Sequence, residues 1–418
     1  MKTSIVLLTV LSGAVAPPPA DLAAWLDEAD RASPAIRAAR ARADAAREVA
    51  AQRSALPDPL LSLAYVNDGL TEITLGSAEF SMLSVGWEQE VPHRDVRRGA
   101  AGIAEAEFAL AGVSIENGRV GLRARVIALY ALLWRHDREA EILRESREVA
   151  ATLAEAALAR YESGEGSQEQ ILRAQVEALR IDVAIEEIAR ARRSVEVAVG
   201  AALGRVGDAA FGPALTLPEG TLPTDVESLA GVAATEAPAV LLALADEERS
   251  VAAIAAARAQ SRISWSWVAA YQYRGELEPM VVGGIGLRLP MWRGRKQDRA
   301  LAEAESARTA AEHDREQTEL EARARVRDLA SEIASLDREI RIVRDGIVPQ
   351  DQAALEAARI AFSTGGAPMT VALDSAARLL ADERDAVQLE AARVAALAEL
   401  EALTGRSLLD VHTTGRSR

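Results

Sequence analysis

The sequence contains no cysteine in its 418 residues, which excludes disulfide bonds, zinc–thiolate sites and iron–sulfur clusters. Aromatic residues are scarce at 4%, whereas charged residues make up 27%. Positive charge is also in deficit, since 63 acidic residues against 48 basic ones give a net charge of −15. Phosphate binding needs a basic surface, so this deficit argues against a nucleic-acid-binding protein. An alanine-rich, charged and aromatic-poor composition instead favours long packed helices.

No motif for catalysis or metal binding occurs in the sequence. The histidines are scattered and form no HExxH pair; they are His93, His136, His313 and His412. There is no GxSxG motif and no phosphate-binding loop with its lysine. Glu88 and Glu90 share one face of a predicted strand, where a polar channel lining explains them more simply than a catalytic carboxylate pair. We therefore expect no enzyme, no catalytic residue, no metal and no cofactor.

The N-terminus has the pattern of a secretory signal peptide over residues 1–16. Lys2 precedes an apolar run, and Ala14-Val15-Ala16 matches the A-x-A cleavage pattern. The alternative is an apolar N-terminus that stays on the protein. We expect no later segment to span a membrane as a helix, because none reaches about 18 consecutive apolar residues. If the exported protein enters a membrane, it must then do so as a β-barrel.

The sequence repeats itself at an offset of roughly 200 residues. Residues 161–164 match residues 362–365, and the two halves close alike on Gly204 and Gly405. Each half predicts a short helix, two strands, a long helix, a tight turn and a second short helix. The predicted boundaries are a first repeat at 17–206, a linker at 207–225, a second repeat at 226–405 and a C-terminal tail at 406–418.

Hydrophobic periodicity indicates that the helices pack as in coiled coils. From Val326 onward, apolar residues of the second long helix follow a strict 3-4 spacing. The long helix predicted at 94–163 measures about 105 Å, and the short helices at 21–55 and 167–203 about 53 Å each. Two short helices end to end therefore match one long helix, which favours a helical tube. Pro349 should kink or loosen the second long helix.

Four windows show the period-two alternation of β-strands, with an apolar face and a polar or small face. They lie at 61–65, 83–91, 264–273 and 281–289. Eight of the 15 aromatic residues fall in or just beyond these windows, which favours a membrane barrel with lipid outside and water inside. A soluble four-stranded sheet over a core is the alternative. Four strands cannot close a barrel, so we expect the barrel to be shared among protomers.

Basic residues follow the second strand of each pair, close to the start of a helix, where a positive charge opposes the helix dipole. We expect Arg97, Arg98, Arg295 and Lys296 to contact anionic lipid headgroups. A solvated basic turn is the alternative.

Two stretches carry a family resemblance: Arg160-Tyr161-Glu162-Ser163-Gly164, followed by Ala174-Gln175, and Gly286 to Lys296, which reads Gly-Leu-Arg-Leu-Pro-Met-Trp-Arg-Gly-Arg-Lys. With the duplicated plan, they resemble the TolC family of outer-membrane efflux proteins, most closely its heavy-metal branch. The resemblance implies a mainly α fold with a β-barrel contribution. It implies a homotrimer with a shared 12-stranded barrel in the outer membrane and an α-helical barrel in the periplasm. Such channels join a periplasmic adaptor to an inner-membrane transporter and conduct substrates passively.

The resemblance also implies functional residues at two hairpin tips. The predicted adaptor contacts are Gly164, Glu165, Gly166, Ser167, Gly365, Gly366, Ala367 and Pro368. Glycine suits the left-handed end of a helix, Ser167 should cap the next helix, and Pro368 should occupy a first helical position. Asp374, about two turns further on, should line the channel aperture and attract cations. A solvated aspartate on the helix surface is the alternative.

Two other functions fit the same sequence. The chain could be the outer-membrane conduit of a type I protein secretion system, or a soluble periplasmic coiled-coil adaptor or structural protein. The transported substrate, whether metal ion, drug or polypeptide, cannot be predicted, because substrate choice rests largely with the inner-membrane pump.

Overall fold

The computed structural model describes residues 19–70, 72–207 and 210–411, so the predicted signal peptide and most of the predicted tail lie outside it. The described residues form two compact units. Of the described residues, the first unit contains 19–34, 119–207, 210–232 and 324–411. The second contains Ala35–Gly118 and Ala233–Arg323. Each unit draws on both predicted repeats, whose boundaries stay a prediction.

Most of the described residues are helical. The helices are α1 (Leu22–Ala32), α2 (Pro34–Ser54), α3 (Arg94–Glu162), α4 (Gln168–Leu203), α5 (Val226–Glu236), α6 (Pro238–Ala259), α7 (Gln297–Arg341), the π-helix η1 (Ile342–Ile347), α8 (Val348–Ser363) and α9 (Met369–Thr404). The single helix predicted at 21–55 is divided at Ser33, because Pro34 cannot donate a backbone hydrogen bond. Pro238 divides α5 from α6 in the same way, which supports the internal duplication.

One prediction about membrane helices needs correction. The stretch Val226–Ala259 is long enough to cross a membrane and contains an 18-residue window with a mean hydropathy of 1.6, whereas no such stretch was expected from the sequence. Glu236 interrupts the consecutive apolar run, whereas the mean over 18 residues tolerates one charged residue. The stretch is made of α5 and α6, which are separated at Ala237, so length and composition are weak evidence for a span.

The two long helices differ although they are predicted repeats. α3 runs for 69 residues without a break, as predicted. Its counterpart is divided into α7, the six-residue π-helix η1 and α8. Pro349 lies in the first turn of α8, so the predicted local loosening is confirmed and takes the form of a π-turn.

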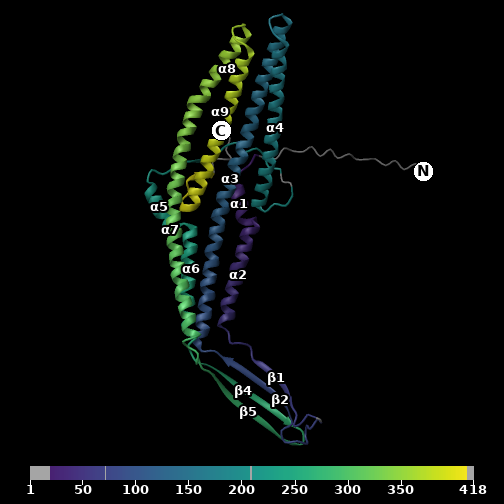
Figure 1. Cartoon of the computed structure of the whole chain (residues 1–418), viewed down its shortest axis with the longest axis vertical. Helices are drawn as coiled ribbons and strands as arrows, with labels where there is room; N and C mark the ends of the chain where they lie inside the picture. Colours follow the sequence, from purple (N-terminus) through teal and green to yellow (C-terminus); the bar gives the residue numbers. More distant parts are fainter. Residues whose placement is uncertain (1–18, 71, 208–209, 412–418) are drawn as a thin grey trace, which may run out of the picture. The chain divides into compact units, whose positions relative to one another are not determined.

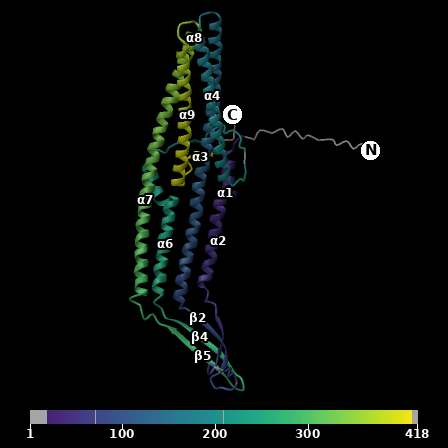
Figure 2. The same ribbon diagram turned by 45° about the vertical axis from the view of Figure 1, so that its right-hand side comes forward.

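The predicted strands form one four-stranded antiparallel sheet in the second unit (Figure 1). The strands are β1 (Leu60–Val66), β2 (Met82–Val91), β4 (Ser264–Arg274) and β5 (Leu277–Arg288), in the order β1-β2-β4-β5. β2 of the first repeat pairs with β4 of the second, with Val91 opposite Trp265. Figures 1 and 2 both show the sheet beyond the ends of α2 and α6. A small second sheet pairs β3 (Glu219–Gly220) with β6 (Leu409–Asp410).

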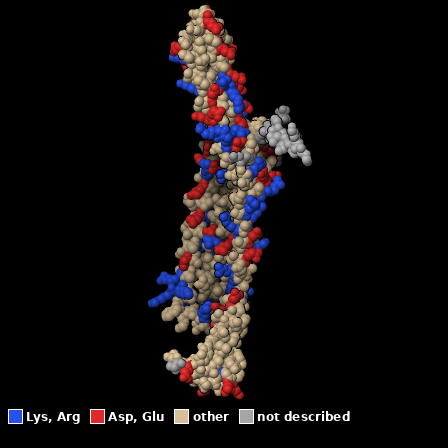
Figure 3. All heavy atoms as spheres, turned by 90° about the vertical axis from the view of Figure 1, so that its right-hand side faces the viewer, with Lys and Arg blue, Asp and Glu red and all other residues tan. Residues whose placement is uncertain are grey.

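The register gives the four-stranded sheet one apolar face and one mixed face, which carries the charged residues of the sheet together with small and some apolar residues. The apolar face carries Leu61, Leu63, Tyr65, Leu83, Val85, Trp87, Trp265, Trp267, Tyr271, Tyr273, Val281, Ile285 and Leu287. The opposite face carries the polar and small residues Ser62, Ser84, Gly86, Glu88, Glu90, Ser266, Gln272, Gly284, Gly286 and Arg288, together with the apolar residues Leu60, Val66, Met82, Val268, Met280 and Val282. Every residue of β1 and β5 is exposed, and the sheet surface visible in Figure 3 is mostly uncharged. The sheet therefore has no core of its own within the described chain.

Small residues bring the two helical hairpins of the first unit together. One buried cluster combines α3, α4, α8 and α9; it consists of Leu153, Ala157, Ala174, Ala358, Phe362, Met369 and Ala372. A second cluster, between α3 and α4, consists of Leu143, Ala150, Ile181 and Ile188. Because alanines let backbones approach closely, these clusters fix the α3–α4 hairpin against the α8–α9 hairpin.

An arginine in α4 ties the linker, residues 207–225, to the first hairpin. Arg192 donates to Asp137 of α3 at 2.6 Å and to the carbonyl of Phe211 at 3.2 Å. Asp137 also accepts the backbone N–H of Ala214 at 2.9 Å. The arginine is 23% exposed and the aspartate 14%, so solvent screens this ion pair only partly.

The second hairpin holds the same linker with an equivalent pair. Arg393 of α9 donates to Asp337 of α7 at 2.5 Å and to the carbonyl of Gly220 at 2.9 Å. The two partners are 55 residues apart in the first pair and 56 apart in the second. The repeats thus share a framework contact that the sequence did not reveal.

Candidate functional site

Both hairpin turns have the left-handed glycine that the sequence predicts. The φ angle is 81° at Gly164 and 79° at Gly365. The two amides after each glycine donate to one carbonyl, that of Arg160 in the first turn and of Ala361 in the second. These bonds satisfy the last carbonyls of α3 and α8, so the turns are equivalent in backbone as well as in sequence.

Both capping predictions were wrong in detail. Ser167 is at the N-cap of α4, but its side chain makes no capping hydrogen bond. Pro368 is the N-cap of α9 rather than a first helical residue, because its ψ of 151° is extended and the helix begins at Met369. The eight predicted adaptor contacts all lie in these turns, where Gly166 and Ala367 are half-buried and the other six are exposed. Their role as adaptor contacts stays a prediction.

Arg160 links one turn to the other. Its Nη1 donates to the carbonyl of Phe362 at 2.5 Å, and its guanidinium carbon lies 5.2 Å from the centre of the Phe362 ring. A stacked cation adds attraction to the hydrogen bond. In the sequence, Arg160 stands out only as part of the stretch Arg160–Gly164. Its role was not visible because the equivalent position in the second repeat is Ala361.

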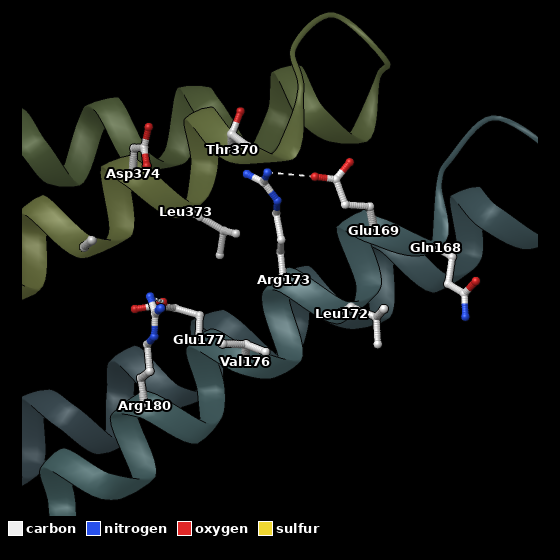
Figure 4. Close-up of a pocket in the computed structure, with 11 residues that line it drawn as sticks. Gln168, Glu169, Leu172, Arg173, Val176, Glu177, Arg180, Thr370, Leu373 and Asp374 are labelled. Carbon is white, nitrogen blue, oxygen red and sulfur yellow. Dashed lines mark hydrogen bonds and ion pairs between the residues drawn. The ribbon is translucent and has the colours of Figure 1, made fainter.

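A groove of about 770 Å³ lies between α4 and α9, directly after the two turns. Figure 4 shows Leu373 of α9 pointing toward α4 and Arg173 of α4 extending toward α9. The groove is lined by Gln168, Glu169, Leu172, Arg173, Val176, Glu177, Arg180, Thr370, Leu373, Asp374 and Ala377. Arg173 pairs with Glu169 at 2.7 Å and Arg180 with Glu177 at 3.3 Å. The lining therefore mixes apolar residues with internally paired charges.

An exposed apolar stripe on α4 continues from this groove. Its members follow a 4-3-4 spacing and are 47–62% exposed; they are Leu172, Val176, Leu179 and Val183. This is the spacing of a coiled-coil contact face. The described part of the chain provides no helix that covers it.

Asp374 lies in the groove lining, and its carboxylate is exposed. It has no ion-pair partner among the described residues. Arg173 precedes Asp374 by 201 residues, the same offset as between Gly164 and Gly365. The two repeats thus place opposite charges at equivalent positions. The predicted role of Asp374 at the aperture is not decided by this placement.

The four predicted headgroup contacts lie near the base of the sheet but in different environments. Arg97 donates to the carbonyl of Ser54 at 3.2 Å, and its Nε is buried without a partner. Arg98 is exposed. Arg295 and Lys296 are exposed in the turn before α7. Contact with lipid stays a prediction for all four residues.

A carboxylate in α3 and a carboxylate in α9 have pKa values that are shifted in opposite directions. Burial disfavours the charged form of Glu139 in α3, but hydrogen bonds from His136 and Arg135 hold its pKa below the usual value. Burial raises the pKa of Glu390 in α9, because Arg344, at 3.4 Å, compensates only in part. Within the described chain, no group of three His, Cys, Asp or Glu residues is arranged to hold a metal ion.

The fold is similar to that of solved outer-membrane proteins, including several outer-membrane channels. The structure of the outer membrane protein VceC from Vibrio cholerae is 21% identical, covers 93% of this chain and 96% of its own, and has a TM-score of 0.76. CusC is 16% identical over 93% and 92%, with a TM-score of 0.79. The open state of the Neisseria gonorrhoeae MtrE outer membrane channel is 16% identical over 93% and 89%, with a TM-score of 0.70.

The family comparison agrees with the fold. Residues 25–205 match the model described as outer membrane efflux protein, and no curated protein sequence matches the chain. The predicted resemblance is confirmed for the matched residues, and the predicted TolC-like fold is confirmed by the solved structures. The chain is thus similar to outer-membrane efflux proteins in the sequence of residues 25–205 and similar to outer-membrane channels in fold.

Proposed function

We propose that this chain forms the exit duct of a tripartite efflux system. Three copies build a 12-stranded barrel in the outer membrane and a helical tube in the periplasm, and substrates pass through without chemical change. An adaptor docks at the tips and connects the duct to an inner-membrane transporter. The observation that carries the proposal is a two-faced sheet with two unpaired edges in a chain of TolC-like fold.

The sheet edges support closure by several copies. β1 and β5 each pair on one side only in the described chain. An open edge invites pairing with another chain, and closure of a barrel removes such edges. Pairing β5 of one copy with β1 of the next closes the sheet, and three copies supply 12 strands. The exposed apolar face then meets lipid, and the face with Glu88, Glu90 and Arg288 lines the lumen. A soluble sheet would leave the apolar face in water.

Reconstitution tests the duct. In detergent, the purified chain should run as a trimer by light scattering, and in planar bilayers it should form water-filled channels. A monodisperse monomer without conductance contradicts the proposal.

The adaptor part of the proposal rests on the groove and the exposed stripe on α4. A helix laid along Leu172, Val176 and Leu179 would bury apolar residues at coiled-coil spacing.

Because the chain has no cysteine, a Glu165→Cys variant offers one reactive thiol at the tip. We expect a thiol-specific cross-linker in the periplasm to join it to a protein with a helical hairpin. The control Glu107→Cys, on α3, should give no such product; equal products from both variants contradict docking at the tip.

A further inference from the structure

A groove at the base of the sheet, formed by α3 and α6, has the residues of an anion-binding site. Its volume is about 430 Å³. Asp95, Arg98, Gly99 and Gly102 line one side, and Ala252, Ala255, Arg258, Ala259 and Arg262 line the other. Apart from the charged residues, the lining is only glycine and alanine. Small residues therefore form the floor of the groove, and arginines lie at its border.

The two helices are held in direct contact at this point. A Cβ on Gly99 would lie 2.7 Å from the Cα of Ala256, so only glycine permits the approach. Gly102, one turn further along α3, has no atom within 4 Å of its Cβ position. The helices thus touch at Gly99 and leave open space at Gly102.

The guanidinium groups of the groove outnumber its carboxylates. Arg262 pairs with Asp95 at 3.2 Å, and Arg258 pairs with Glu305 at 3.5 Å. The side chain of Arg98 makes neither a hydrogen bond nor an ion pair within the described chain. Asp95 is the one carboxylate in the lining against Arg98, Arg258 and Arg262, so the lining is net positive and suits an anionic phosphodiester. Arginine presents several donors to phosphate oxygens in a fixed geometry.

The groove lies next to the first residues of β4, and this position points to a lipid as its ligand. Arg262 lies two residues before β4, and the backbone N–H of His93 donates to Ser264, the first residue of that strand, at 3.1 Å. Trp265 follows at once on the apolar face of the sheet and is 43% exposed. Tryptophan is enriched at the membrane interface, and basic pockets at that level bind headgroups.

We propose that this groove binds the phosphodiester of an anionic phospholipid, with Arg98, Arg258 and Arg262 as ligands. The proposal rests on the outer-membrane position of the sheet and not on conduction. It differs from a general attraction of basic side chains to the membrane, because it requires the open space beside Gly102.

Two substitutions test this requirement. Gly102→Leu keeps every charge and fills the groove, whereas Arg98→Gln removes the arginine that has no partner. Gly112→Leu is the matched control, since a Cβ at Gly112, also in α3, meets no atom within 4 Å. Phosphatidylglycerol and phosphatidylcholine are added to the full-length protein in detergent, and bound lipid is counted by native mass spectrometry. Inorganic phosphate is tested separately as a stabiliser in thermal unfolding.

We expect the wild-type protein and Gly112→Leu to retain phosphatidylglycerol over phosphatidylcholine, and both test variants to lose at least tenfold in affinity for it. Equal retention by Gly102→Leu and Gly112→Leu would overturn the proposal, because binding would then need no groove. Stabilisation by inorganic phosphate equal to that by phosphatidylglycerol would also overturn it, since the site would then take a free anion. Conductance is recorded in parallel, so that failure of lipid binding is distinguishable from failure of the channel.

Discussion

The two hairpins of the first unit show which features a duplicated chain keeps and which it changes. Both tie the linker with an arginine and an aspartate, but the partners are 55 residues apart in the first hairpin and 56 apart in the second. A π-turn bonds residue i to i+5, so it accommodates one residue more than an α-turn. η1 lies between Asp337 and the second tip, where the additional residue must fall. The second hairpin therefore absorbs an insertion without shifting its contacts.

A pair of deletions tests this explanation and should give the largest effect. Removing Gly346 from η1 should convert the π-turn to α-helix and leave the downstream register unchanged. Removing Ser146, the equivalent residue of α3, should turn the following residues by roughly 100° and move Leu153 and Ala157 off their core. We expect the Ser146 deletion to prevent stable trimers and the Gly346 deletion to preserve them. Size-exclusion chromatography with light scattering measures both, and equal loss would refute the insertion model.

The second-largest effect should come from substituting the arginines that hold the linker. Arg192→Ala should cost about 2–3 kcal/mol, because it leaves Asp137 partly buried without its cation. Arg393→Ala should cost less, because Arg192 also bonds Glu196 and Gly212, whereas Arg393 bonds only Asp337 and Gly220 among the described residues. Thermal unfolding followed by circular dichroism measures the difference. The exposed neighbour variant Arg193→Ala is the control and should change the melting temperature little.

Buried glutamates should make the hairpins respond oppositely to pH. The raised pKa of Glu390 means that the folded state binds its proton more tightly than the unfolded chain. This contribution is complete below the ordinary value of 4.5 and is lost as the pH rises through the folded pKa. Glu390→Gln should therefore raise the melting temperature at pH 7, by roughly 1–2 °C, and change it little at pH 4.

The pKa of Glu139 is shifted in the opposite direction, and the same measurement of melting temperature against pH tests it. Its lowered pKa contributes stability above the ordinary value of 4.5, and this contribution is lost as the pH falls through the folded pKa. Glu139→Gln should therefore lower the melting temperature at pH 7, and the difference should shrink toward acid. If both variants shift the melting temperature in the same direction at pH 7, the contrast between the two carboxylates is wrong.

Local features were the most predictable from sequence. The tip glycines were predictable because a left-handed residue inside a helical pattern leaves few alternatives to glycine. The strands were predictable because alternation over ten residues, as from Ser264 to Tyr273, has no helical explanation. The break at Pro34 was missed because apolar spacing continues through it.

Contacts between distant segments were not predictable. Arg192 and Asp137 are two of many charged residues on α4 and α3, and nothing in the sequence distinguishes them from their neighbours. Their pairing appears only in the folded structure. The π-turn was visible in the sequence only as Pro349, since the additional residue appears once equivalent contacts have been aligned. The groove beside Gly102 depends on the approach of α6 to α3, which no pattern in either helix encodes.

The smallest effect should come from the charges at the tip groove, where the repeats differ in sign. Arg173 and Asp374 are equivalent, so a trimer would present three of each near the periplasmic end rather than carboxylates alone. Each charge is exposed and therefore screened, which limits a single substitution to about a two- to fivefold change in the cation-to-anion permeability ratio. Asp374→Asn should lower this ratio and relieve block by divalent cations added on the periplasmic side. Arg173→Gln should raise the ratio, although its pairing with Glu169 reduces the gain. Single-channel reversal potentials in a salt gradient give both values. If Arg173→Gln changes the ratio while Asp374→Asn leaves it and the divalent block unchanged, Asp374 lies outside the conduction path, and the first hairpin alone sets the charge at this end.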